Sequence, residues 1–215
     1  MRTVINLTPR MRNKEKQLAT TLSIWCGFLI SLGALAYLLV GGPLGAILFS
    51  FGLITVTHTG RRCLYTGWVG ICNFSNKEGW GRLFLMLFWN TIGVCLGALL
   101  TSAMNVDVQQ SATTIVENRL EMSHLAILSK SLVTGVIMHC CVWMAIYKQT
   151  VIPILIGVPL FILCGLPHCI ADVYYYSIYT YFNWDITVIV PWVISIIGNT
   201  IGCNLPGIFN EDLYN

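Results

Sequence analysis

The string Asn90-Thr91-Ile92-Gly93 lies inside a long apolar run and recurs as Asn199-Thr200-Ile201-Gly202 inside another. The two runs, Leu83–Met104 and Ile186–Cys203, are close to the roughly 20 apolar residues that an α-helix needs to cross a bilayer. A cysteine follows closely behind each copy of the string. The sequence therefore predicts a membrane protein with an internal repeat.

Apolar runs of spanning length occur at two further places, Leu18–Val40 and Ala126–Tyr147. Two shorter runs, Leu44–Val56 and Val151–Leu166, stop early, and each is followed by a break and a second short apolar piece. These second pieces are Cys63–Cys72 and His168–Tyr179. Interrupted helices are tolerated in a membrane only where the freed backbone is buried in protein or lines a cavity. We therefore expect an all-α membrane protein with six transmembrane helices, of which the second and fifth are broken.

The segments that lead into the two broken helices also correspond. Gly41-Gly42-Pro43-Leu44-Gly45 precedes the first, and Ile152-Pro153, followed by Gly157, precedes the second. Three crossings separate the halves, and because three is odd the two three-helix repeats are inserted in opposite orientations. Inverted repeats with paired interrupted helices are typical of transporters and channels whose site lies near the membrane midplane.

The composition excludes several other classes of protein. Hydrophobic residues make up 56% of the 215 residues and charged residues 10%, with a mean hydropathy of +0.73. A soluble domain carries about 25% charged residues, so neither a soluble domain nor a disordered chain fits. The net charge of +3 is too small for a nucleic-acid binder. The nine cysteines lie mostly in apolar runs without a CxxC pair, which favours packed thiols over disulfides or a zinc site, and no cofactor is expected.

Basic residues predict the orientation in the membrane. The first segment, Met1–Gln17, carries five Lys or Arg residues against one acidic residue, and it is expected to be retained because the apolar run behind it is too long for a signal peptide. Placing this segment in the cytoplasm satisfies the positive-inside rule, puts both termini inside, and indicates a multi-pass protein of the plasma or inner membrane. The expected units are a cytoplasmic segment at 1–17, repeats at 18–104 and 126–204, an extracytoplasmic connection at 105–125, and a cytoplasmic tail at 205–215.

Motifs at both breaks identify a family. The first half carries Phe49-Ser50-Phe51-Gly52-Leu53-Ile54 and then Leu64-Tyr65-Thr66-Gly67, and the second half carries Gly165-Leu166-Pro167-His168-Cys169-Ile170-Ala171-Asp172. These motifs, over roughly residues 24–204, resemble the formate/nitrite transporter family, whose loops usually read Leu-Phe-Thr-Gly-Asn and Gly-Phe-Glu-His-Ser-Ile-Ala-Asn. The resemblance implies an aquaporin-like hourglass protomer, assembled as a homopentamer with one pore in each subunit.

The resemblance also implies which residues form the pore. His168 would be the central ionisable group, and its ordinary pKa of about 6.5 suits a proton donor or a switch. Leu53 and Phe161 would form apolar constrictions on either side of His168. The remaining pore positions lie in the cytoplasmic-side loop and are Leu64, Tyr65 and Thr66.

Two departures from the family pattern lie beside His168. Pro167 stands where the family has a glutamate, and Asp172 stands where it has an asparagine. Because Asp172 follows His168 by four residues, the two side chains can share one helix face, and we expect Asp172 to replace the missing glutamate as the hydrogen-bond partner of His168.

Cations are expected near the mouths of the pore. By the resemblance, Arg119 takes the place of a family lysine that faces the outer vestibule, where a lone cation concentrates anions. Arg61 and Arg62 lie in the break of the second helix, where they either add to an anion-attracting field or extend to lipid headgroups.

The implied function is passage of small monovalent weak-acid anions such as formate, nitrite or hydrosulfide, with a pore histidine that gates the path or protonates the anion. The expected partners are this anion, the lipid bilayer and further copies of the chain. One alternative is a channel for neutral solutes such as urea, glycerol or water on the same fold. Others are a membrane-embedded metalloenzyme, built on groups such as His139 and His168, and a homologue with only a structural or regulatory role.

Overall fold

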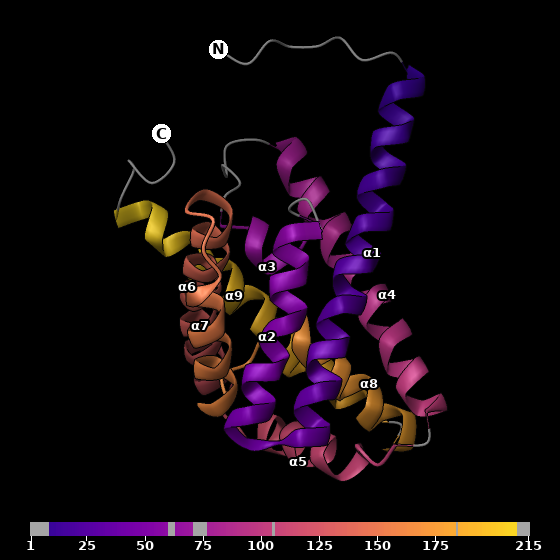
Figure 1. Cartoon of the computed structure of the whole chain (residues 1–215). Helices are drawn as coiled ribbons and strands as arrows, with labels where there is room; N and C mark the ends of the chain where they lie inside the picture. Colours follow the sequence, from indigo (N-terminus) through magenta and orange to yellow (C-terminus); the bar gives the residue numbers. More distant parts are fainter. Residues whose placement is uncertain (1–8, 60–62, 71–76, 105, 184, 210–215) are drawn as a thin grey trace.

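The computed structural model describes residues 9–59, 63–70, 77–104, 106–183 and 185–209, and the regular elements in these residues are all helical (Figure 1). In chain order they are α1 (Pro9–Val40), α2 (Gly42–Thr59), α3 (Tyr65–Trp68), α4 (Lys77–Ala103), α5 (Gln109–Leu120), α6 (His124–Tyr147), α7 (Ile152–Leu163), α8 (Ala171–Asn183), the 3-10 turn η1 (Ile186–Val188) and α9 (Ile189–Phe209).

Five helical segments are long and apolar enough to cross a membrane. They are Gln17–Val40, Gly42–Thr59, Gly79–Ala103, His124–Tyr147 and Ile186–Pro206. The apolar helix α7 is shorter, at 12 residues. The four long spans predicted from the sequence all coincide with these helices, because hydropathy over 20 residues is a strong signal of a membrane-spanning helix.

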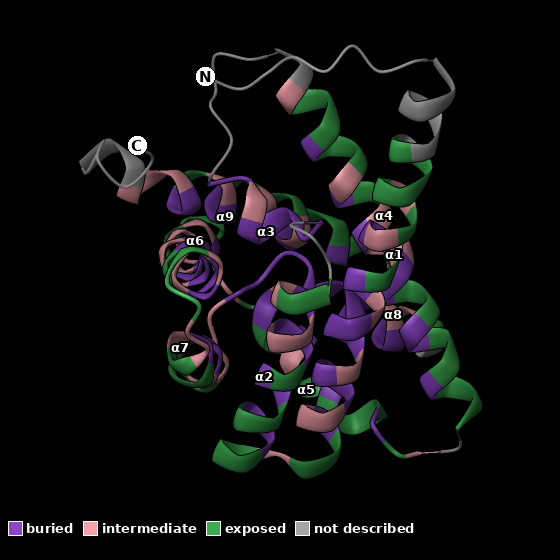
Figure 2. Cartoon of the chain, turned by 45° about the horizontal axis from the view of Figure 1, so that its top comes forward, coloured by how far each residue is buried: buried purple, intermediate pink, exposed green. Residues whose placement is uncertain are grey.

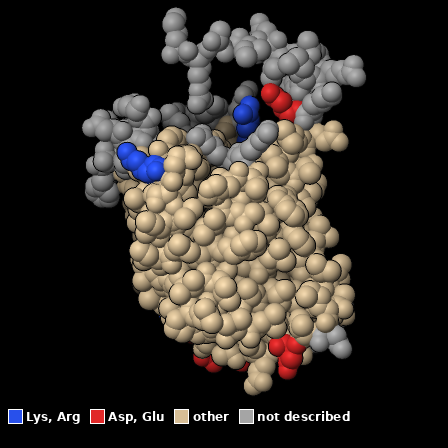
Figure 3. All heavy atoms as spheres, in the orientation of Figure 1, with Lys and Arg blue, Asp and Glu red and all other residues tan. Residues whose placement is uncertain are grey.

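The outer surface of the bundle is apolar. Phe84, Leu99 and Ile156 are more than 60% exposed, while buried residues gather where the helices meet (Figure 2). In the space-filling view, charged side chains lie at the two ends of the molecule and a broad belt between them carries none on this face (Figure 3). A helix with apolar residues all round is stable in lipid but not at a water-facing surface. The belt therefore fits a membrane environment.

The helices alternate in direction between the two ends of the bundle. The start of α1 and the end of α9 lie at one end of the bundle, and α5 lies at the other (Figure 1). The short helix α3 lies in the half nearer the start of α1, and α8 lies in the half nearer α5. Gly41 and Gly42, with φ of 68° and 55°, let the chain reverse between α1 and α2, because left-handed φ is strained for other residues. Gly165, with φ of 61°, ends α7 in the same way.

Two helix pairs pack with their backbones in close contact, α1 with α4 and α6 with α9. A Cβ atom built on Gly93 of α4 would collide with the carbonyl oxygen of Ile24 in α1. A Cβ atom on Gly202 of α9 would collide in the same way with the carbonyl oxygen of Leu132 in α6. Small residues at such crossings let membrane helices approach closely. The glycines of the two repeated strings thus perform the same packing task.

The structure differs from the expected boundaries at several helix ends, among them the start of α1 at Pro9 and the longer extent of α2, Gly42–Thr59. The connection at 105–125 contains the amphipathic helix α5, which the hydropathy argument did not predict, and α4 begins at Lys77 rather than at Leu83. Residues 109–120 are rich in Gln, Ser and Thr, and their apolar members Ala112 and Val116 are buried against the bundle. Tertiary packing of one face stabilises this helix more than intrinsic propensity does.

Candidate functional site

Asn90 of α4 holds the segment that leads into α3. Its Oδ1 accepts a hydrogen bond from the Tyr65 backbone N–H at 2.8 Å, and its Nδ2 donates to the Cys63 carbonyl at 2.9 Å. The same Nδ2 donates to the carbonyl of Ser23 in α1 at 2.7 Å. One fully buried amide therefore satisfies non-helical backbone groups that would otherwise be unpaired inside the membrane.

Asn199 of α9 holds the segment that leads into α8 in the same way. Its Oδ1 accepts from the Cys169 backbone N–H at 2.8 Å, and its Nδ2 donates to the Pro167 carbonyl at 3.2 Å. It also donates to the carbonyl of Ser131 in α6 at 2.7 Å. The first residue of each repeated string thus fixes a short non-helical segment against two long helices.

The two segments meet at His168. Its Nε2 lies 2.9 Å from Thr66 Oγ1. A buried hydrogen bond between these two side chains therefore joins the two asparagine-bound regions. Phe161, at the end of α7, stacks on the imidazole with ring centroids 5.4 Å apart. Phe49 of α2 contacts Phe161 edge-on at 6.2 Å. Together these four side chains form a buried plug in the middle of the bundle.

The hydrogen bonds of His168 fix its tautomer. The Ala171 backbone N–H donates to Nδ1 at 3.0 Å, so Nδ1 is the acceptor and the proton of a neutral ring resides on Nε2. The Nε2–H group then donates to Thr66 Oγ1. His168 also caps the first turn of α8, because its carbonyl accepts from the Asp172 N–H at 2.8 Å. The imidazole is therefore held neutral and oriented by the start of α8.

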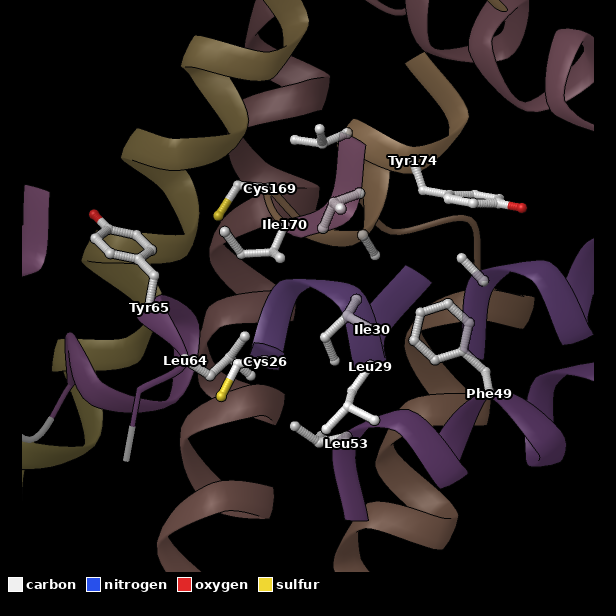
Figure 4. Close-up of a cluster of buried hydrophobic side chains, with 14 of the residues drawn as sticks. Cys26, Leu29, Ile30, Phe49, Leu53, Leu64, Tyr65, Cys169, Ile170 and Tyr174 are labelled. Carbon is white, nitrogen blue, oxygen red and sulfur yellow. The ribbon is translucent and has the colours of Figure 1, made fainter. Parts of the chain in front are cut away.

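The other predicted pore residues surround this plug. Leu53 is fully buried, one turn along α2 from Phe49, and lies in the apolar cluster of Figure 4 together with Leu64 and Tyr65. The Tyr65 hydroxyl lies 2.7 Å from Thr200 Oγ1 of α9. A hollow of about 10 Å³, room for about one water, lies beside Leu64 at the α3 end. Leu53, Leu64, Tyr65, Thr66, Phe161 and His168 are thus brought together.

A cavity of about 380 Å³ lies on the α5 side of the plug. Its walls come from α1, α5, α6, the end of α7 and the start of α8, and it contains Arg119, Lys130 and Asp172. Phe161 forms part of its floor and separates it from His168. A large cavity with three charged side chains in its walls and a one-water hollow therefore lie on opposite sides of the plug.

Arg119 and Asp172 form a buried ion pair in this cavity. Arg119 Nε lies 3.4 Å from Asp172 Oδ2, and the two side chains are only 7% and 3% exposed. Arg119 Nη1 also donates to the Gly165 carbonyl at 2.7 Å, which fixes the end of α7. Arg119 is therefore not the lone cation of the sequence expectation, because Asp172 compensates its charge.

The predicted hydrogen bond between the Asp172 and His168 side chains is wrong. Both ring nitrogens of His168 are already used, one by Thr66 and the other by the Ala171 N–H. No donor remains on the ring for the carboxylate, and a buried carboxylate is stabilised most by a full opposite charge, which Arg119 supplies. The i, i+4 spacing of His168 and Asp172 is compatible with a contact between them. It did not show that other partners occupy both ring nitrogens of His168.

The roles of the two repeated asparagines and of Lys130 did not follow from the sequence. The asparagines of the repeat were recognised as a string but not as the anchors of the two segments, although a lone amide in an apolar helix is itself a signal of a structural or functional role. Lys130 of α6, to which no sequence motif assigns a role, also lines the cavity. Arg61 and Arg62 lie outside the described residues.

The chain has the features of a membrane channel or transporter protein. These features are the apolar helices, the asparagine-anchored segments and the plug between two hollows. Its sequence matches the model of the formate/nitrite transporter family over residues 5–209. The chain belongs to this family. No curated protein matches the sequence.

Two solved structures show the same fold. One, described as a pentameric formate channel with formate bound, is 22% identical with a TM-score of 0.78, over 91% of this chain and 94% of that chain. The other, described as an FNT family ion channel, is 18% identical with a TM-score of 0.78, over 91% and 89% of the two chains. At these identities the likeness concerns the fold.

Proposed function

We propose that this protein is a channel for small monovalent anions of weak acids, such as formate, nitrite or hydrosulfide. The observation that carries the proposal is the plug, in which one neutral histidine lies buried between an aromatic ring and a threonine hydroxyl, with a cationic cavity on one side. Membership of the formate/nitrite transporter family and the fold shared with a pentameric formate channel support it.

We further propose that the chain crosses the membrane six times as two inverted three-helix repeats. In this reading α2 with α3 forms the second crossing and α7 with α8 the fifth. The matching contacts of Asn90 and Asn199 support the repeat, since each anchors the segment before the shorter helix to the first helix of its own half. We also propose a homopentamer, and cytoplasmic termini with α5 on the outer side.

The plug gives the proposed pathway its chemistry. An anion that leaves the cavity loses its water shell at Phe161, which is costly in an apolar passage. The Nε2–H of His168 is the donor at this point, and an anion that displaces Thr66 accepts its hydrogen bond. The neutral ring keeps this proton and orients the anion, and a proton taken up from the aqueous solution on the cavity side would let a neutral acid cross the dry stretch. Arg119 and Asp172 hold the floor of the cavity in place.

A flux panel tests the proposal. Purified protein in liposomes should conduct formate, nitrite or hydrosulfide well above protein-free liposomes, at external pH values of about 5 and 7.5. Urea and glycerol should pass no faster than through lipid alone. Passage of urea without any of the anions would instead establish the neutral-solute alternative. Absence of all fluxes from a folded preparation would favour a structural or regulatory role.

A further inference from the structure

The outer cavity contains two cations, and they are in different states. The Arg119 guanidinium is held by Asp172 and by the Gly165 carbonyl. Its positive charge is therefore cancelled within the wall of the cavity. An anion that bound Arg119 would have to compete with a buried carboxylate 3.4 Å from Nε.

Lys130 of α6 lines the same cavity with its charge uncompensated. It is half-buried, and only its backbone carbonyl is used, as the acceptor for Thr134 Oγ1 at 3.2 Å. Within the described part of the chain its ammonium group has neither a hydrogen-bond nor an ion-pair partner. A cation in a hollow with low-dielectric walls attracts anions more strongly than the same cation on an open surface.

The cavity also offers room and donors around Lys130. Asn118 of α5 lines it, and its side chain has no hydrogen-bond partner in the described residues, whereas the hydroxyl of the neighbouring Thr114 already donates to the Gln110 carbonyl at 3.1 Å. The volume of about 380 Å³ is several times the roughly 30 Å³ that one water occupies in the liquid. A small anion can therefore bind there while keeping part of its water shell, before it reaches Phe161.

We propose that Lys130 is the residue that captures the incoming small monovalent anion, and that the Arg119–Asp172 pair is a neutral structural wall of the same cavity. This inference rests on the proposed function. It moves the anion-attracting role away from Arg119, where the sequence resemblance placed it, because the charge there is already paired. The predicted ligand is a partly hydrated monoanion bound by an ammonium group and neighbouring neutral donors.

Formate influx from the α5 side, measured in sealed membrane vesicles of known orientation, tests the role of Lys130. Lys130→Gln should raise the formate concentration for half-maximal influx by roughly tenfold while the maximal rate changes little, since the variant removes attraction without touching the plug. Lys130→Arg should keep the wild-type value. Lys148→Gln, at the exposed opposite end of α6, is the matched control and should leave the value unchanged.

The charge at position 130 can also be set after the protein has folded, so that a folding defect of a variant does not affect the result. Lys130→Cys is treated with a methanethiosulfonate that adds an ammonium group or with one that adds a sulfonate, and wild-type protein treated identically corrects for its native cysteines. The ammonium adduct should restore affinity for formate and the sulfonate adduct should lower it further. Equal half-maximal concentrations for both adducts would overturn the inference. If the wild-type protein conducts no anion at all, the proposed function fails first, so the two failures are distinguishable.

Discussion

At the scale of single residues, the molecule is governed by a few buried polar groups whose partners are specific. Arg119 and Asp172 are the clearest case, because each is almost fully buried and faces the other. Removing one member of such a pair leaves an uncompensated charge and costs about 3–5 kcal/mol, whereas removing both costs less. Neither residue is close to the other in sequence, so this pairing was beyond the reach of local spacing arguments.

A double-mutant cycle checks this pair. Arg119→Gln and Asp172→Asn should each lower the thermal unfolding midpoint in detergent, and the double variant should unfold at a higher temperature than Arg119→Gln alone. Glu117→Gln, two residues from Arg119 and exposed on α5, serves as the control and should have little effect. Strictly additive losses would mean that the two side chains do not interact.

The bond between Thr66 and His168 makes a second prediction at this scale. Thr66→Val keeps the shape of the side chain but removes the hydroxyl that accepts from His168 Nε2–H. Because a net hydrogen bond is worth about 1–1.5 kcal/mol, its loss should change formate flux roughly tenfold. Thr66→Ser retains the hydroxyl and should conduct much as the wild type. Wild-type flux in the valine variant would show that the anion does not pass this contact.

At the scale of elements, the sequence predicted what depends on hydropathy and missed what depends on contacts. The long apolar runs became helices, and the duplicated string marked two corresponding positions. The partners of Asn90 and Asn199 lie 25 to 68 residues away, so no local pattern could identify them. The helix α5 was missed because its stability comes from burying one face against the bundle.

The repeated glycines give the prediction at this scale. Gly93→Ala and Gly202→Ala should each destabilise the fold by about 1–3 kcal/mol, because the added Cβ would meet the backbone of the neighbouring helix and the helices must separate. Gly81→Ala is the matched control on α4, since a Cβ there meets nothing within 4 Å. Thermal unfolding of the purified variants measures the difference, and equal midpoints for all three would contradict the close packing.

At the scale of the whole molecule, the charged residues that the structure describes include two groups. Charges at the ends of the bundle leave between them a belt without charged side chains on the face shown in Figure 3. Arg119, Lys130 and Asp172 instead lie in a cavity that reaches toward the plug. Composition and motifs predicted the membrane class and the family, and the family resemblance named His168, Phe161 and Thr66 as pore positions. Whether each of these charged side chains is paired or free could be learned only from the folded structure.

The central claim is that an anion crosses at His168, and one measurement tests it most directly. Formate flux through liposomes is compared for the wild type and His168→Asn across external pH values of about 5 to 8. Asparagine can accept the Ala171 N–H and so retain the cap of α8, but it removes the ring whose Nε2–H donates to Thr66. The account predicts robust wild-type flux and a variant with lower flux at every pH. Identical flux for the two proteins at every pH would contradict it.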